Sequence, residues 1–185
     1  RACLAVGLAV VLSPLLPAPT PRELPVVDIS ALMAGGRLGP LGLRALRAAA
    51  TRLGAFRVVG HGVEIDRVLN ASRAFFELPL ATKRAVRGAQ NTPSFQRGYI
   101  GLGGESGLAS YLELKEGFCY GYEWGADEIA TSTPNALSGP NSWPPDHALG
   151  PAWRARLVDY FTAAGAVAAA VSRGIAQALG GADAL

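Results

Sequence analysis

The chain has 185 residues, half of them hydrophobic, and a formal net charge of +3 at pH 7. That hydrophobic content is ample for a buried core, so the composition excludes disorder of the whole chain. The arginines are scattered along the sequence rather than gathered into a run, so nucleic-acid binding is not expected. Cys3 and Cys119 lie far apart, which excludes a CxxC metal motif and favours a reducing, cytoplasmic location.

Residues 1–23 differ in composition from the rest. Residues 2–16 are apolar, lack acidic side chains and follow Arg1, a pattern typical of a signal peptide or an organellar leader within residues 1–20. Pro14 and the short length argue against a stable membrane span. A Pro-rich, disordered extension explains the segment equally well, and both interpretations stay open.

The first folded elements are predicted to alternate between strand and helix. The β-branched Val26, Val27 and Ile29 favour a strand, and a helix follows that ends at Gly54. The apolar face of that helix is predicted to comprise Leu43, Leu46, Ala50 and Leu53. A second strand through Phe56, Val58 and Val59 is ended by a turn at Gly60-His61-Gly62.

Two further helices are predicted before a long irregular stretch. The first carries an apolar face of Ile65, Leu69, Ser72 and Phe76, and the second is short, starting at Pro79 and running through Lys83 and Arg84. Residues 88–107 are predicted to be loop, with an extended piece at Tyr99 and Ile100.

The last elements are a strand and a long helix. Phe118, Tyr120 and Tyr122 alternate with smaller residues, which predicts an aromatic strand face. Residues 131–151 are predicted to be irregular. Beyond them, residues 151–180 form a helix with an apolar stripe at Trp153, Leu157, Tyr160, Ala164, Val167, Val171, Ile175 and Leu179.

Five ordered segments resemble one protein family. They are residues 24–29 (Leu-Pro-Val-Val-Asp-Ile), 54–63 (ending Gly-His-Gly-Val), 75–80 (Phe-Phe-Glu-Leu-Pro-Leu) with Lys83, 97–99 (Arg-Gly-Tyr) and 113–120. In this order they resemble the N-terminal region of isopenicillin-N-synthase-like, iron(II)- and 2-oxoglutarate-dependent oxygenases. The resemblance implies an α+β fold of short strands flanked by helices. Its final long helix would pack on a double-stranded β-helix (jelly-roll) core absent from this chain.

The resemblance also implies where the metal is held. Relatives bind iron(II) through a His-x-Asp pair and a distant His in that core, and 2-oxoglutarate through an Arg-x-Ser pair. His61 and His147 are not followed by Asp at the second position. We therefore expect no catalytic, metal or cofactor residue in this chain, and iron(II) and 2-oxoglutarate only in the intact parent.

Several residues are of types that could form a functional site. His61 is interpreted as a bracing turn residue, His147 as solvent-facing and Cys119 as a structural thiol. The glycine-rich residues 101–107 do not fit a dinucleotide motif, and Lys115 and Glu116 are interpreted as a solvated pair of charges. Arg97 and Tyr99 are the candidate substrate-binding residues, because the resembled enzymes bring this region to the mouth of the core and arginine suits a carboxylate.

The leading hypothesis is that residues 24–181 are the N-terminal structural and substrate-entrance domain of an oxygenase that oxidises a small organic molecule. Its partner would be the missing catalytic core. One alternative is a standalone binding or scaffold module from a truncated gene, and another is a leader-bearing protein concerned with secretion or membrane attachment. Expressed alone, the chain is expected to be molten or poorly soluble, because little sequence remains to cover the stripe of the long helix.

Overall fold

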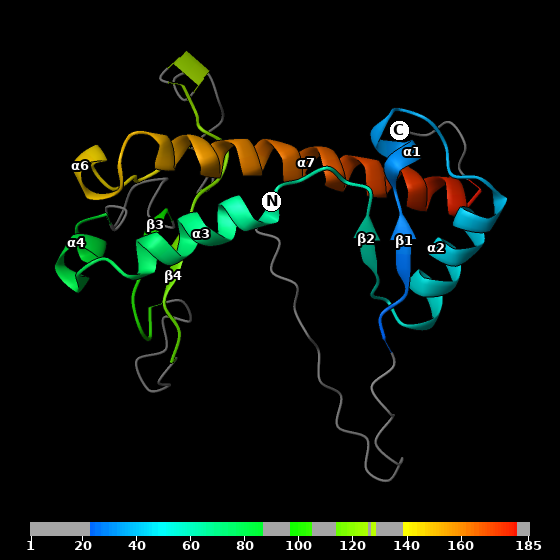
Figure 1. Ribbon diagram of the computed structural model, residues 1–185, viewed down its shortest axis with the longest axis horizontal. Coiled ribbons are helices and arrows are strands. Elements are labelled where there is room, and N and C mark those ends of the chain that lie inside the picture. The colour runs from blue at the N-terminus through cyan, green and yellow to red at the C-terminus, as the bar shows by residue number, and fades with distance from the viewer. Residues whose placement is uncertain (1–22, 87–96, 105–113, 126, 129–138, 181–185) are drawn as a thin grey trace, which may run out of the picture. The chain divides into compact units, whose positions relative to one another are not determined.

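The computed structural model describes residues 23–86, 97–104, 114–125, 127–128 and 139–180. The chain divides into two compact units, each described here by itself (Figure 1). The first unit comprises Arg1–Gly62 and Gly165–Leu185, and the second comprises Val63–Ala164. Within the described residues the fold mixes helices with a few three-residue strands, which confirms the α+β expectation at that level.

The first unit is a parallel strand pair packed on helices. Its elements are β1 (Val26–Asp28), α1 (Ser30–Met33), α2 (Pro40–Arg52), β2 (Arg57–Val59) and the C-terminal part of α7 (Ala152–Ala178). Val27 pairs with Val58 in the register of β1 and β2. The core consists of Val27, Ile29, Leu32, Leu38, Leu46 and Ala170.

Local sequence signals explain the boundaries in this unit. Pro40 begins α2, where its missing amide hydrogen has no helical partner to lose. Gly60 has a φ of +73° directly after β2, and a Cβ there would meet the Asp28 carboxylate and Ser30. Both the backbone conformation and the close approach require glycine, so the predicted turn before His61 is confirmed.

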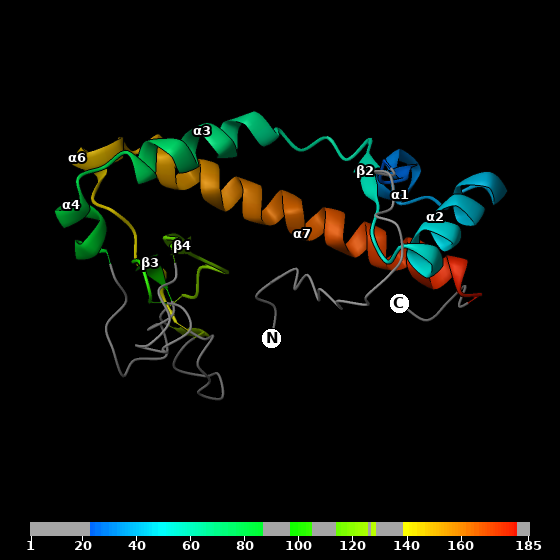
Figure 2. The same ribbon diagram turned by 90° about the horizontal axis from the view of Figure 1, so that it is seen from below.

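The second unit is built around aromatic side chains. Its elements are α3 (Ile65–Phe76), α4 (Leu80–Ala85), β3 (Gly98–Ile100), β4 (Gly117–Cys119), α6 (Asp146–Leu149) and the N-terminal part of α7. In Figure 2, α3 lies along that part of α7, and the indole nitrogen of Trp153 donates a hydrogen bond of 2.8 Å to the carbonyl of Ala71. Strands β3 and β4 are antiparallel, with Tyr99 opposite Phe118.

The predicted apolar face of α3 is wrong. Ile65 and Leu69 are 42% and 45% exposed, whereas Ala71 and Phe75 are 1% exposed. The helix is apolar on more than one side, and the paired aromatic residues at its end allow two faces of similar hydropathy. The contact with Trp153 selects the face of Ala71 and Phe75, and periodicity alone does not encode that contact.

The expectation of an uncovered α7 stripe is wrong for part of the stripe. Trp153 and Leu157 are 4% and 2% exposed and belong to the core of the second unit. Farther along, Val167, Val171 and Ile175 pack against the core of the first unit. At the end of the predicted stripe, Leu179 is 69% exposed. The described residues therefore bury two members of the stripe and partly cover five others, and the expectation of a molten chain stays a prediction.

Smaller differences concern the segments around β4 and α6. The strand β4 ends at Cys119, so Tyr122 lies outside it and is 51% exposed. The four-residue α6 lies in the stretch predicted to be irregular, and residues 129–138 of that stretch lie outside the described residues. The leader-like residues 1–20 lie outside them as well. None of the helices in the described ranges combines the length and hydropathy needed to cross a membrane.

Helix α2 offers a direct test of the first unit's core. Replacing Leu46, which is 1% exposed, by Ala should lower the free energy of unfolding by about 2–5 kcal/mol, because it leaves a cavity between α2 and β1. Leu41→Ala in the same helix is the matched control, since Leu41 is 80% exposed and its change should stay within about 0.5 kcal/mol. Urea denaturation followed by circular dichroism measures both. Equal midpoints for the two variants would contradict the assigned core.

Candidate functional site

A buried lysine links three elements of the second unit. The Lys83 side chain, in α4, is 9% exposed. Its ammonium donates to both carboxylate oxygens of Glu116 at 3.0 and 2.9 Å and to the carbonyl of Phe76 at 3.0 Å. The Tyr99 hydroxyl donates to Oε2 of Glu116 at 2.7 Å, and the ammonium lies 5.7 Å from the centre of the Tyr99 ring. This network joins the ends of α3 and α4 to the β3–β4 hairpin.

The network shifts the pKa values of Glu116 and Tyr99. The hydrogen bonds from Lys83 and then Tyr99 hold the pKa of Glu116 below its usual value. The bond to Glu116 and then burial raise the pKa of Tyr99 above its usual value. Near neutral pH, Glu116 is therefore a carboxylate and Tyr99 a neutral donor. The prediction that Lys115 and Glu116 form a solvated pair is wrong for Glu116, because Lys83 occupies its carboxylate.

Arg97, one of the two candidate substrate-binding residues, lies directly before β3 and is half-buried. Its guanidinium occupies the space that a side chain at Gly121 would fill. Tyr99, the other candidate, is 4% exposed and bonded to Glu116. Between them, Gly98 has a φ of +85° and lies so close to the carbonyl of Val86 that no Cβ fits there.

A second polar cluster surrounds the backbone of Gly121. The Asn141 side chain, in a residue only 9% exposed, accepts from the amide of Gly121 and donates to its carbonyl, both at 2.9 Å. Asn141 also donates to the Glu123 carboxylate at 3.0 Å, and the Trp143 indole donates to it at 2.7 Å. Arg154 lies 3.2 Å from the same carboxylate. Burial favours a higher pKa for Glu123, but the bonds from Asn141 and Trp143 and the charge of Arg154 outweigh it and lower the pKa.

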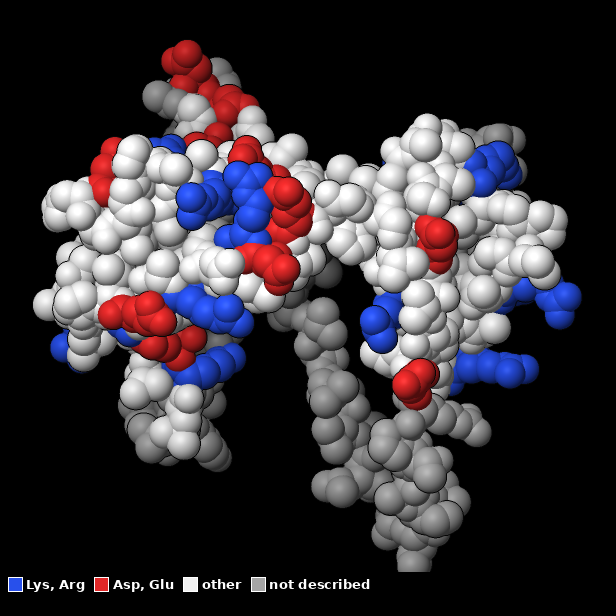
Figure 3. Space-filling model, viewed as in Figure 1, with Lys and Arg blue, Asp and Glu red and all other residues white. Residues whose placement is uncertain are grey.

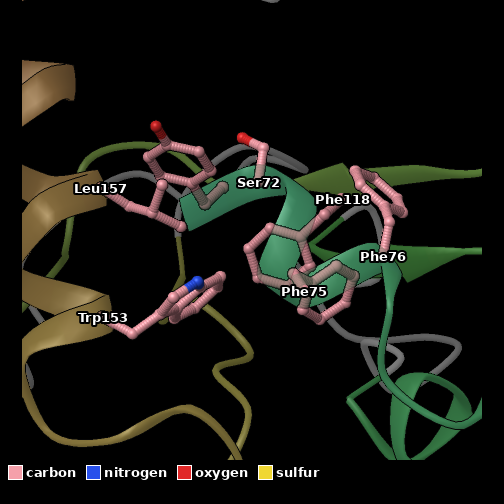
Figure 4. Close-up of a pocket in the computed structure, with 7 residues that line it drawn as sticks. Ser72, Phe75, Phe76, Phe118, Trp153 and Leu157 are labelled. Carbon is pink, nitrogen blue, oxygen red and sulfur yellow. The ribbon is translucent and has the colours of Figure 1, made fainter. Parts of the chain in front are cut away.

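One small cavity lies among the aromatic residues of this unit. Its volume is about 60 Å³, and its lining is drawn in Figure 4: Ser72, Phe75, Phe76, Phe118, Tyr120, Trp153 and Leu157. Burial raises the pKa of Tyr120 to about 12, so its hydroxyl stays protonated near neutral pH. Pockets for organic ligands are typically about 300–1,000 Å³. This cavity is therefore too small to hold a substrate by itself.

Neither histidine belongs to a metal-binding group within the described part of the chain. His61 is half-buried in the first unit, and His147 is exposed in the second, as predicted. Among the residues that the structure describes, no three His, Cys, Asp or Glu side chains are grouped so that they could hold an ion. Cys119 is half-buried, as predicted for a structural thiol, and part of the glycine-rich segment 101–107 lies outside the described residues.

The charged side chains of the second unit are of both signs. On the side shown in Figure 3, Lys and Arg side chains of the second unit are interspersed with Asp and Glu. The sequence analysis missed Lys83 and Asn141 as buried polar residues. The only signal for Lys83 was its place after the Phe-Phe-x-Leu-Pro segment, and nothing local marked Asn141.

The lysine network should be sensitive to loss of its cation. Lys83→Met leaves the Glu116 carboxylate half-buried and without its ion-pair partner, and should lower the free energy of unfolding by about 2–4 kcal/mol. Lys115→Met is the matched control, because Lys115 is exposed and is the only other lysine in the chain. Urea denaturation measures both, and a Lys83→Met midpoint equal to that of Lys115→Met would rule out a stabilising network.

Acid should weaken the same network. Because the pKa of Glu116 is lower in the folded chain than in the unfolded one, its contribution to stability is complete above the unfolded value, near 4.5, and is lost as pH falls toward the lower folded value. Glu116→Gln should therefore be less stable than wild type at pH 7, and the difference should shrink as the pH is lowered from 5 toward 3. Unfolding midpoints at several pH values check this, and a difference independent of pH would contradict it.

Comparison with known proteins agrees with this architecture. Residues 24–146 match the family described as non-haem dioxygenase in morphine synthesis N-terminal. The chain is 39% identical over 95 residues to the 2-oxoglutarate-Fe(II) type oxidoreductase hxnY of Emericella nidulans, covering 49% of this chain and 27% of that protein. It is 32% identical over 125 residues to jasmonate-induced oxygenase 4 of Arabidopsis thaliana, covering 66% and 30%.

Solved structures show the same fold at lower identity. A full-length Neurospora crassa protein, solved in complex with alpha-KG and 5-formyluracil, matches with a TM-score of 0.59 and 23% identity over 85% of this chain and 44% of its own. A 2OG-Fe(II) oxygenase family protein from Caulobacter crescentus matches with a TM-score of 0.60 and 22% identity, over 84% and 48%. The chain spans less than a third of the two curated relatives named above. It belongs to the non-haem dioxygenase N-terminal family, and the relatives that it matches include proteins named as 2-oxoglutarate-dependent oxidoreductases and dioxygenases.

Proposed function

We propose that residues 24–181 form a domain that supports the catalytic core of an oxygenase and lines the entrance for its substrate. The domain itself takes no part in metal binding. The iron(II) and 2-oxoglutarate sites lie in a double-stranded β-helix core carried by the remainder of the parent protein. The single observation that carries this proposal is that the buried polar residues of the second unit, Lys83 and Asn141, bond to neighbouring segments of the chain.

The chemistry of the parent would come from its bound metal. Iron(II) with 2-oxoglutarate and oxygen supplies the oxidising power to hydroxylate or desaturate a small organic molecule. Residues of this chain would act on the substrate only by contact and orientation. Arg97 is proposed to pair with an anionic group of the substrate, since a guanidinium offers paired donors suited to a carboxylate. Tyr99, buried and bonded to Glu116, is proposed to form the wall of the same entrance.

Sequencing the transcript beyond the codon for Leu185 tests whether the parent protein carries its metal site outside this domain. An open reading frame that continues into His-x-Asp, a later His and then Arg-x-Ser supports the proposal. A stop codon directly after Leu185 would favour the alternative of a standalone binding or scaffold module. The specific observation in favour of that alternative is the burial of Trp153 and Leu157 within the chain's own second unit.

Kinetics of the complete oxygenase test the role of Arg97. Arg97→Ala should raise the substrate KM about 10- to 100-fold with a smaller change in kcat, because a charged hydrogen bond contributes about 1.5–3 kcal/mol. Arg97→Lys should recover part of the loss, since the charge returns without the paired geometry. Arg44→Ala, at an exposed position of α2, is the control and should leave KM unchanged. A normal KM for Arg97→Ala would remove Arg97 from the entrance.

A further inference from the structure

The backbone conformation at Gly121 does not require glycine. Its φ lies outside the left-handed region that favours glycine, unlike that of Gly98. A Cβ at Gly121 would nevertheless collide with the Arg97 guanidinium, whose Nη1, Cζ and Nη2 atoms would all lie within 2.8 Å of it. Gly117, at the start of β4, has open space at the corresponding position. The missing side chain at Gly121 is therefore needed for one described contact, the one with Arg97.

The peptide beneath the guanidinium is itself held in place. Asn141 bonds to both the amide and the carbonyl of Gly121 at 2.9 Å, and its amide nitrogen also donates to Glu123 at 3.0 Å. Asn141 is 9% exposed, so these bonds are shielded from competing water. The backbone of Gly121 thus forms a fixed surface rather than part of a freely moving loop.

The backbone that directly follows Arg97 is anchored as well. The amide of Tyr99 donates to the carbonyl of Val86 at 3.2 Å, and Gly98 pairs with Cys119 in the β3–β4 hairpin. The Tyr99 hydroxyl is tied to Glu116 and, through it, to Lys83. The backbone after Arg97 is anchored and its guanidinium lies against Gly121. Arg97 therefore loses much of the rotamer freedom that a long side chain otherwise has.

We propose that Gly121 is a positioning residue, which seats the Arg97 guanidinium in one orientation at the substrate entrance. This inference rests on the proposed substrate contact by Arg97 and deepens it. A guanidinium ordered in advance loses less entropy on binding and presents its paired donors in a fixed plane, which suits a planar anion such as a carboxylate. The substrate class that fits is a small organic acid, bound through its carboxylate.

The positioning of the Arg97 guanidinium by Gly121 is tested on the 185-residue chain without any substrate. Gly121→Ala should displace the flexible end of Arg97 while leaving the fold intact, because the backbone conformation suits alanine and the colliding group can move. The rate at which p-hydroxyphenylglyoxal modifies Arg97, read by peptide mass spectrometry, should rise about three- to tenfold. Gly117→Ala is the matched control, and in that variant the reagent should modify Arg97 at the wild-type rate. Arg67, exposed on α3, should react equally in all three proteins.

A second variant covers the case in which Gly121→Ala alters the fold, as judged by circular dichroism. Asn141→Ala removes both bonds to the Gly121 peptide and should also raise the modification rate of Arg97. A rate at Arg97 in folded Gly121→Ala equal to that in Gly117→Ala overturns the proposal. If Gly121→Ala is misfolded, an unchanged rate in Asn141→Ala overturns it.

Steady-state kinetics then distinguish the positioning role of Gly121 from the substrate contact by Arg97. In the complete oxygenase, Gly121→Ala should raise the substrate KM about three- to tenfold, and adding it to Arg97→Ala should produce no further rise. If Arg97 is modified faster in Gly121→Ala but Arg97→Ala leaves KM unchanged, the positioning role of Gly121 is supported and the substrate role of Arg97 is excluded. If Arg97→Ala raises KM but Gly121→Ala does not, the positioning role of Gly121 fails while the entrance remains.

Discussion

The buried ammonium of Lys83 is the constraint on which the second unit depends. It must find three acceptors away from water, and it finds them in the carboxylate of Glu116 and the carbonyl of Phe76. Satisfying that one cation fixes where α3 ends, how α4 lies and where the chain enters β4. The Tyr99 hydroxyl then has one carboxylate oxygen to bond to, which sets the position of β3 relative to α4.

The aromatic cluster supplies the apolar half of the same arrangement. Phe75 lies 4.5 Å from Phe118 and 5.8 Å from Trp153, measured between ring centres, so one side chain of α3 contacts both the hairpin and α7. The remaining cavity of about 60 Å³ is a packing gap rather than a ligand pocket. A unit packed in this way is suited to holding an entrance in a fixed shape, and its described polar groups hold the backbone in place.

The lysine network and the aromatic cluster both contact the β3–β4 hairpin. The residues proposed to contact substrate lie in or beside the same hairpin. Arg97 lies directly before β3 and Tyr99 is the middle residue of that strand, whereas Gly121 follows β4 closely. The lysine network therefore acts on β3 through Tyr99, and the Asn141 cluster acts on the chain just after β4 through Gly121. A three-residue strand pair is weakly stable by itself. Its geometry is therefore set by its side-chain anchors, which makes a single missing side chain, at Gly121, consequential.

The sequence by itself determined the family and the order of the longer helices and the strands, but it did not predict the four-residue helices α1 and α6. Ordered motifs and strong local signals, such as the β-branched run of β1, Gly54 after α2 and the Gly60 turn, act over a few residues and need no partner. Tertiary structure alone decided which face of α3 is buried, that Glu116 pairs with Lys83 rather than Lys115, and that Gly121 lies beneath Arg97. Each of these depends on contacts between residues far apart in the chain, or between faces of similar hydropathy. Local periodicity carries no information about such choices, because they are settled by packing and by the need to satisfy buried charge.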